Sequence, residues 1–203
     1  MALTPEEFRD RTGVSRETLS RLSRYAELLV KWQARINLVG RSTISDLWHR
    51  HMLDSAQLFP LLPKDARLLV DLGSGAGFPG LVLAILGVPE VHLIESDTRK
   101  AAFLREVSRE TSAGAMVHAV RIEQAPAIEA DAVTARALAP LPVLLEHAGR
   151  FATANSVLLF PKGQDVGKEL TDTPEHKKMT VDAVPSITDS SGTILRITGF
   201  VRA

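Results

Sequence analysis

Val-Asp-Leu-Gly-Ser-Gly-Ala-Gly-Phe-Pro-Gly, residues 70–80, is the stretch of this sequence that decides the fold. Leu68 and Leu69 precede it, so an apolar strand leads directly into a glycine-rich turn. Glycines allow the backbone to turn tightly and to approach a ligand closely. Pro79 suits the first turn of a helix, because the N–H that it lacks would have no partner within the helix. The succession of strand, glycine turn and helix predicts a cradle of the kind that binds nucleotides.

The spacing of the glycines distinguishes two kinds of cradle. The dinucleotide fingerprint is G-x-G-x-x-G, but Phe78 occupies the position of its third glycine. This substitution disfavours an oxidoreductase that uses a nicotinamide cofactor. Asp71 instead begins the pattern D-x-G-x-G-x-G, which resembles motif I of class I S-adenosylmethionine (SAM) methyltransferases. The glycines of this pattern are Gly73, Gly75 and Gly77.

From residue 67 onward, short apolar strands alternate with helices. The predicted strands cover residues 68–72, 91–95, 116–121, 132–136, 156–160, 180–185 and 193–201, and the predicted helices lie near 79–87, 98–112 and 138–152. This alternation indicates a mostly parallel sheet covered on both faces. The last two strands are expected to form an antiparallel hairpin through residues 189–192. We therefore predict an α/β fold of the class I SAM-methyltransferase type, with a Rossmann-like, mostly parallel sheet of seven strands.

The beginning of the chain has a different pattern. We predict that residues 1–66 form a helical appendage and that residues 67–203 form the methyltransferase domain as one compact unit. Three helical stretches are expected. The first begins at a capping box at residues 4–7, the second runs from about residue 15 to 36, and the third runs from about 43 to 62. In the second stretch, apolar residues recur every three or four positions, which is typical of a helix that packs one face on a core.

A polar residue or a glycine follows each of the first five predicted strands. These residues are Asp71 and Gly73, Glu95, Arg121 to Glu123, Arg136, and Pro161 to Gly163. Ligands of open α/β sheets bind outside the carboxyl ends of the strands, so we expect these groups at one rim. Glu95, 22 residues after Gly73, is placed to accept hydrogen bonds from ribose hydroxyls. Enzymes that methylate exocyclic amino groups of bases often have an Asn/Asp-Pro-Pro-aromatic turn after the fourth strand. This chain has Arg-Ala-Leu-Ala there, beginning at Arg136, which disfavours an exocyclic amino group as the methyl acceptor.

Composition excludes several chemistries. The chain has no cysteine, which excludes disulfides, thiolate zinc sites, iron–sulfur clusters and a cysteine nucleophile for pyrimidine carbon 5. No cluster of His, Asp and Glu has metal-ligand spacing, so we expect no metal. Neither a secretory leader nor an apolar run long enough for a membrane is evident. A monomer in the cytoplasm, without membrane contact, is the expectation.

The charges are distributed unevenly. The net charge is zero, but residues 1–70 carry 11 Lys/Arg and 8 Asp/Glu. A neutral chain argues mildly against a protein that holds nucleic acid mainly through phosphates. The basic excess is either solvated helix surface or part of a nucleic-acid interface.

Between Tyr25 and Glu169, the sequence resembles the bacterial 16S ribosomal RNA guanine-N7 methyltransferase family, RsmG, also called glucose-inhibited division protein B (GidB). The matching segments are Trp32 with residues 36–38, 48–55, 71–80, 93–96, Lys100, 103–104, 121–123, 136–137 and 162–163. Arg-His-x-x-Asp-Ser at 50–55 and Gly-Phe-Pro-Gly at 77–80 are much more specific than the glycine pattern alone.

The resemblance implies SAM-dependent methylation of guanine N7 in the 530-loop region of 16S rRNA, with S-adenosyl-L-homocysteine as product. The implied partner is 16S rRNA or the small ribosomal subunit. The predicted cofactor residues are Asp71, Gly73, Gly75, Gly77, Phe78, Glu95, Ile122, Glu123 and Arg136. The candidates for RNA contact or for support of the pocket are Arg50, His51, Asp54, Lys100 and Lys162, with Arg136 and Lys162 as positioning residues.

The expected reaction needs no general base, because guanine N7 has an available lone pair at neutral pH. The absence of an obvious base therefore favours N7 over amine and hydroxyl acceptors. Two alternatives stay open from the sequence. One is a SAM-dependent methyltransferase of a small molecule or a protein, and the other is a non-catalytic RNA-binding protein with the same fold.

Overall fold

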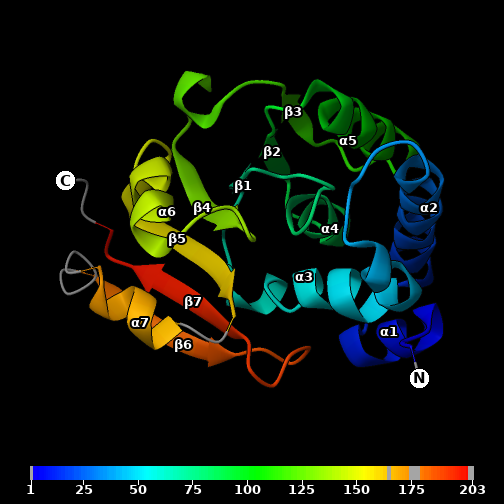
Figure 1. The fold of residues 1–203 in the computed structure, drawn as a ribbon, viewed down its shortest axis with the longest axis horizontal. Coiled ribbons are helices and arrows are strands. Elements are labelled where there is room, and N and C mark those ends of the chain that lie inside the picture. Colours follow the sequence, from blue (N-terminus) through cyan, green and yellow to red (C-terminus); the bar gives the residue numbers. More distant parts are fainter. Residues whose placement is uncertain (1, 164–165, 174–178, 201–203) are drawn as a thin grey trace.

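In the computed structural model, helices pack around a central sheet (Figure 1). The structure describes residues 2–163, 166–173 and 179–200. The strands are β1 (Leu68–Leu72), β2 (Glu90–Ile94), β3 (Met116–His118), β4 (Ala130–Ala135), β5 (Ala152–Lys162), β6 (Thr180–Pro185) and β7 (Thr193–Thr198). They lie in the order β3-β2-β1-β4-β5-β7-β6. The first five are mutually parallel, and β7 runs antiparallel to β5 and β6. The predicted fold class and closing hairpin are confirmed, although Val201 of the last predicted strand lies outside the described residues.

Helices cover both faces of the sheet. They are α1 (Pro5–Thr12), α2 (Arg16–Gln33), α3 (Asp54–Ala56), α4 (Gly80–Leu86), α5 (Thr98–Glu110), α6 (Leu141–Ala148) and α7 (Val166–Thr171). Alternate residues of β1 serve two apolar clusters, since Leu69 faces α2, α4 and α5 while Val70 faces α6. The N-terminal helices share the first cluster with α4 and α5, so they belong to the same core as the sheet. Within the described part of the chain, no helix has the length and apolar character needed to cross a membrane.

The first two predicted helices are confirmed, and so is the capping box of the first. Thr4 accepts a hydrogen bond from the Glu7 amide at 3.2 Å, and the Glu7 carboxylate accepts one from the Thr4 amide at 2.8 Å. This capping box satisfies amides that the first turn leaves without helical partners. Ser15 caps α2 in a similar way, through the Thr18 amide.

The predicted helical stretch from about 43 to 62 is present, but as a succession of short helical turns instead of one regular helix. The segment contains 3₁₀ turns at Arg41–Asp46 (η1) and Phe59–Leu61 (η3), a π turn at Trp48–Leu53 (η2), and α3. His51, Met52 and Leu53 are all buried. At the end of η2, the Asp54 amide donates to the His49 and His51 carbonyls, which replaces the bond to the fourth preceding residue that a regular α-helix would make.

Three smaller expectations are also corrected. The third strand ends at His118 instead of 121, and a 3₁₀ turn at Ile122–Gln124 (η4) follows it. Pro79 is the N-cap of α4, one position before the predicted first turn. The sequence pattern predicted no helix where α7 lies, because only Val166 of this short segment is buried.

Gly77 closes the glycine turn against the core. Its φ is 93°, and an added Cβ would lie 2.5 Å from Leu81 Cδ1 and 2.7 Å from Tyr25 Oη. Both the backbone conformation and the space around it therefore demand glycine. This close approach seats the turn on α2, which explains why Gly77 is part of the pattern although it is buried.

We expect Gly77→Ala to lower the free energy of unfolding by about 2–5 kcal/mol, from left-handed strain and overpacking. Gly13→Ala is the matched control, because Gly13 has φ 70° and no atom within 4 Å of an added Cβ. The control should cost only the backbone strain, about 1–2 kcal/mol. Urea unfolding of both variants measures the difference, and equal losses would contradict the steric argument.

Candidate functional site

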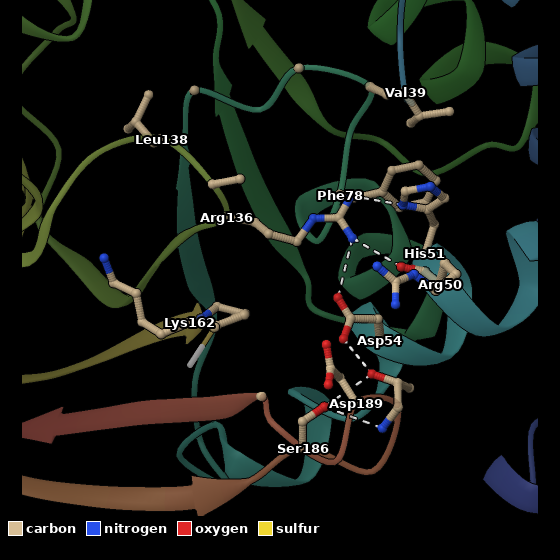
Figure 2. Close-up of a pocket in the computed structure, with 18 of the residues that line it drawn as sticks. Val39, Arg50, His51, Asp54, Phe78, Arg136, Leu138, Lys162, Ser186 and Asp189 are labelled. Carbon is tan, nitrogen blue, oxygen red and sulfur yellow. Dashed lines mark hydrogen bonds and ion pairs between the residues drawn. The ribbon is translucent and has the colours of Figure 1, made fainter. Parts of the chain in front are cut away.

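A cavity of about 860 Å³ opens at the carboxyl ends of β1, β4 and β5. The chain leaves β1 toward β2 on one side, while β4 continues the sheet on the other, so the cavity lies at the topological switch point where α/β sheets bind ligands. Three segments complete its walls, namely residues 38–57, the loop 136–140 after β4, and the hairpin turn between β6 and β7. Figure 2 shows their side chains around the cavity.

The glycine turn presents its backbone to this cavity. Of residues 69–85, only Gly73 and Gly75 are not buried. A Cβ at Gly75 would have only the Gly73 carbonyl oxygen nearby, at 3.7 Å, whereas a Cβ at Gly73 would lie 2.6 Å from Leu138 Cδ1. The Gly75 amide donates a hydrogen bond to Glu95 Oε2 at 2.8 Å. Glu95 at the end of β2 thereby fixes the turn from behind.

Phe78 joins the glycine turn to the N-terminal segment. The rings of Tyr25 and His51 both stack on Phe78, with centroids 5.1 and 5.0 Å away and interplanar angles of 18° and 22°. The Tyr25 hydroxyl also donates a hydrogen bond to the Ala76 carbonyl. The Arg136 guanidinium carbon lies 5.0 Å from the Phe78 centroid, within the range of a cation–π contact.

Arg136 extends from the end of β4 into the middle of the site (Figure 2). Its Nη1 donates to Asp54 Oδ2 at 3.2 Å, and its Nη2 donates to His51 Nδ1 at 3.1 Å. Asp54 Oδ1 accepts in turn from the Thr188 hydroxyl at 2.6 Å and from Gln57 Nε2 at 2.9 Å. Residues 51–54 thus hold the guanidinium, and the turn between β6 and β7 supports Asp54 through Thr188.

Lys162 lines the cavity, and its ammonium is bonded within the protein. Its ammonium donates to Glu169 Oε2 at 2.7 Å and to the Ala139 carbonyl at 3.0 Å. Glu169 also accepts the Leu141 amide at 2.8 Å. Lys162 and Glu169 therefore clamp the loop 136–140, in which Ala137 has a left-handed φ of 51°.

Two cations of the lining stay unpaired. Within the described residues, the side chains of Arg50 and Lys100 form no hydrogen bond or ion pair, and both line the cavity. His51 is not a third cation. Burial, followed by repulsion from Arg136 and Arg50, lowers the pKa of His51 to about 3, so its ring is neutral at physiological pH.

The structure brings nine predicted residues together at the cavity. They are Arg50, His51, Asp54, Gly73, Gly75, Phe78, Lys100, Arg136 and Lys162. Five others lie outside its lining, namely Asp71, Gly77, Glu95, Ile122 and Glu123. Glu95 and Gly77 support the turn from behind, as described above. Ile122 packs on the α6 side of the core, and the largely exposed Glu123 carboxylate lies 3.9 Å from His147.

No sequence pattern predicted the residues that hold the site together. They include Tyr25, Thr43, Gln57, Glu169 and Thr188. Four of them bond a residue at least 28 positions away, whereas Thr43 bonds His51 at a separation of eight. No local pattern marks such side chains, since only the packing of the elements selects their partners.

Asp71 is completely buried beneath the turn. Its Oδ1 accepts the Thr134 hydroxyl at 2.7 Å, whereas its Oδ2 has no hydrogen-bond partner within the described residues. Burial raises the pKa of Asp71 from 3.8 to about 6, although the Thr134 hydroxyl and the nearby Gly80 amide lower it. The folded protein therefore binds this proton more tightly than the unfolded chain does.

The stability that protonated Asp71 contributes is complete below its unfolded pKa of about 4 and disappears as the pH rises through about 6. Asp71→Asn has a similar volume but does not ionise. We expect the free energy of unfolding of the wild type to fall, relative to this variant, between pH 4.5 and 7. Urea unfolding at several pH values tests this, and parallel profiles would show that Asp71 ionises normally.

Comparisons with known proteins all match this chain to methyltransferases. The family model of GidB, rRNA small subunit methyltransferase G, matches residues 18–194. A Rhodospirillum centenum protein named ribosomal RNA small subunit methyltransferase G is 62% identical over 191 residues, which cover 94% of this chain and 88% of that protein. A Paramagnetospirillum magneticum protein of the same name is 58% identical, covering 95% and 94%. The solved O-methyltransferase from Bacillus cereus, in complex with SAH, shares the fold with a TM-score of 0.60 at 12% identity, covering 88% of this chain and 90% of that one.

Proposed function

Because the chain belongs to the GidB family of ribosomal RNA small subunit methyltransferases G, we propose that it transfers a methyl group from SAM to guanine N7 of 16S ribosomal RNA. The observation that carries this proposal is the composition of the cavity. The glycine turn presents backbone to the cavity, Arg50 and Lys100 line it without a side-chain hydrogen bond or ion pair among the described residues, and each carboxylate of the lining accepts a hydrogen bond. A nucleoside-containing donor fits the glycine backbone, and an anionic acceptor fits the two cations.

The residues present fit a SAM molecule. A cavity of about 860 Å³ is within the size range of cofactor sites, roughly 300–1,000 Å³. Gly75 leaves open the space that a side chain would fill, so a ligand can contact the main chain there. When bound, SAM supplies a methyl group that is already activated on a sulfonium. We assign the contact with SAM to the main chain of Gly73 and Gly75. The predicted ribose residue Glu95 lies outside the cavity lining and accepts the Gly75 and Asp97 amides, so we assign to it the support of the turn.

The state of the titratable groups supports N7 as the acceptor. Asp54, Glu169 and Asp189 are the carboxylates of the described lining, and their hydrogen-bond partners are Arg136, Lys162 and Ser191, respectively. Both nitrogens of the neutral His51 ring are also bonded. The ion pairs of Asp54 and Glu169 and the two bonds of the His51 ring disfavour these groups as bases, and attack by guanine N7 requires no base. Catalysis then consists of alignment and exclusion of water.

Arg50 and Lys100 suit the RNA. Arginine and lysine bind phosphate, and arginine also matches the O6 edge of guanine. Arg136 is held in place by Asp54 and His51, but its Nε–H makes no hydrogen bond within the described residues. We assign to Arg136 the placement of the target base and to Lys162 the support of the loop that carries it.

Gly75→Ala should weaken the binding of SAM and of S-adenosylhomocysteine at least tenfold, about 1.4 kcal/mol. The physical reason is that the new methyl group projects into the space that the ligand would occupy. Isothermal titration calorimetry on the folded variant measures the affinity. Gly13→Ala introduces similar backbone strain at a remote turn and should bind normally. An unchanged affinity in Gly75→Ala would remove the turn from the site.

Arg50→Ala should weaken RNA binding and reduce the slope of log affinity against log salt by about 1, because one phosphate contact is lost. Its affinity for SAM should stay unchanged, since the two ligands use different walls. Arg16→Ala is the control, because Arg16 is an exposed arginine outside the cavity lining. Loss of SAM binding with normal RNA binding would mean that residues 38–57 cover the cofactor instead.

The function itself is tested by mapping N7-methylguanine in 16S rRNA from cells with and without this protein. The purified protein should restore the modification when incubated with labelled SAM and the unmodified RNA or small subunit. Labelling of a small molecule or a protein, with RNA left unmethylated, would overturn the proposal.

A further inference from the structure

A chain of hydrogen bonds connects the two walls of the cavity through one histidine. Arg136 Nη2 donates to His51 Nδ1 at 3.1 Å, and His51 Nε2 lies 2.7 Å from the Thr43 hydroxyl. The Thr43 hydroxyl in turn donates to the Gly40 carbonyl at 2.7 Å. Thr43 and Gly40 belong to one wall, and Arg136 belongs to the other.

The proton positions along this chain follow from the bonding capacity of each group. A threonine hydroxyl has one hydrogen, and Thr43 gives it to Gly40, so Thr43 can only accept from His51. His51 must therefore carry its proton on Nε2. A guanidinium can only donate, so the remaining lone pair, on Nδ1, is what Arg136 requires. Every bond in the chain depends on this single tautomer.

Other contacts make the arrangement rigid. The His51 ring is buried and stacks on Phe78, which prevents it from turning over. Gln33 accepts the Leu38 and Val39 amides at 2.9 and 3.1 Å, and it fixes the segment that leads to Gly40. The segment that carries the Gly40 carbonyl, the last acceptor of the hydrogen-bond chain, is thus held by α2.

We propose that Thr43 and His51 are positioning residues, in which the threonine selects the Nε2–H tautomer of His51 and the histidine then holds the Arg136 guanidinium in the cavity. His51 acts as a neutral spacer and not as a cation that contacts RNA. The proposal rests on the proposed function only for the task that Arg136 performs. The bonding itself is a property of the protein without ligands.

The groups around the ring explain why a neutral spacer is needed. Arg136 approaches from the end of β4, Arg50 is the adjacent residue, and Asp54 lies three residues further on, bonded to Arg136. A protonated His51 would place an N–H against the guanidinium and would repel it. The tautomer therefore determines whether Arg136 stays in contact with Phe78 and Asp54.

The test is nitrogen-15 NMR of the histidine rings in the full chain without ligands, with the His51 signals assigned from a His51→Gln variant. In the wild type we expect a neutral Nε2–H tautomer from pH 8 down to pH 5. Thr43→Val keeps the side-chain shape but removes the acceptor, so the tautomers should mix. Its maximal methylation rate should fall about tenfold, while the affinity for SAM changes less than twofold.

Thr43→Ser retains the hydroxyl and should restore both the tautomer and the rate. An Nδ1–H tautomer or a protonated ring in the wild type would overturn the proposal. So would a Thr43→Val protein that keeps the wild-type spectrum, or a Thr43→Ser protein that behaves like Thr43→Val. The spectra need neither RNA nor SAM, so a failure of this proposal is distinguishable from a failure of the proposed function.

Discussion

The left-handed backbone of the turn after β1 is the constraint on which the rest of the site depends. Gly73, Gly75 and Gly77 have φ values of 61°, 57° and 93°, which residues with side chains adopt only at a cost. Because every second residue from Gly73 to Gly77 has such a conformation, the chain reverses within a few positions and exposes main chain at Gly73 and Gly75. The cavity, its glycine-lined wall and the start of α4 all follow from this geometry.

The turn does not support itself, and the N-terminal helices are therefore part of the site. Glu95 at the end of β2 holds the Gly75 amide, and Tyr25 on α2 holds the Ala76 carbonyl. Phe78 then receives the rings of Tyr25 and His51. An appendage that merely packed on the sheet would not reach these atoms. Here the same residues that bury the N-terminal segment also shape the cavity.

Charge is organised locally, although the chain as a whole is neutral. Arg136 and Lys162 are neutralised by Asp54 and Glu169, which makes them rigid parts of the framework. Arg50 and Lys100 line the same cavity and remain available for an anionic ligand. A net charge of zero is thus compatible with an RNA substrate, because what a bound phosphate experiences is the unpaired charge nearby and not the total.

The sequence alone determined the glycine turn, the alternation of strands and helices, the capping box of α1, and the family, because each is encoded in residues close together along the chain. Of the nine predicted residues that line the cavity, Gly73, Arg136 and Lys162 were predicted because strand ends converge at one edge, whereas Arg50, His51, Asp54 and Lys100 came from the family resemblance. Only the tertiary structure decided what these residues do. His51 and Arg136 are 85 positions apart, and Asp54 and Thr188 are 134 apart. Such bonds depend on how the elements cross in space, which no local pattern records.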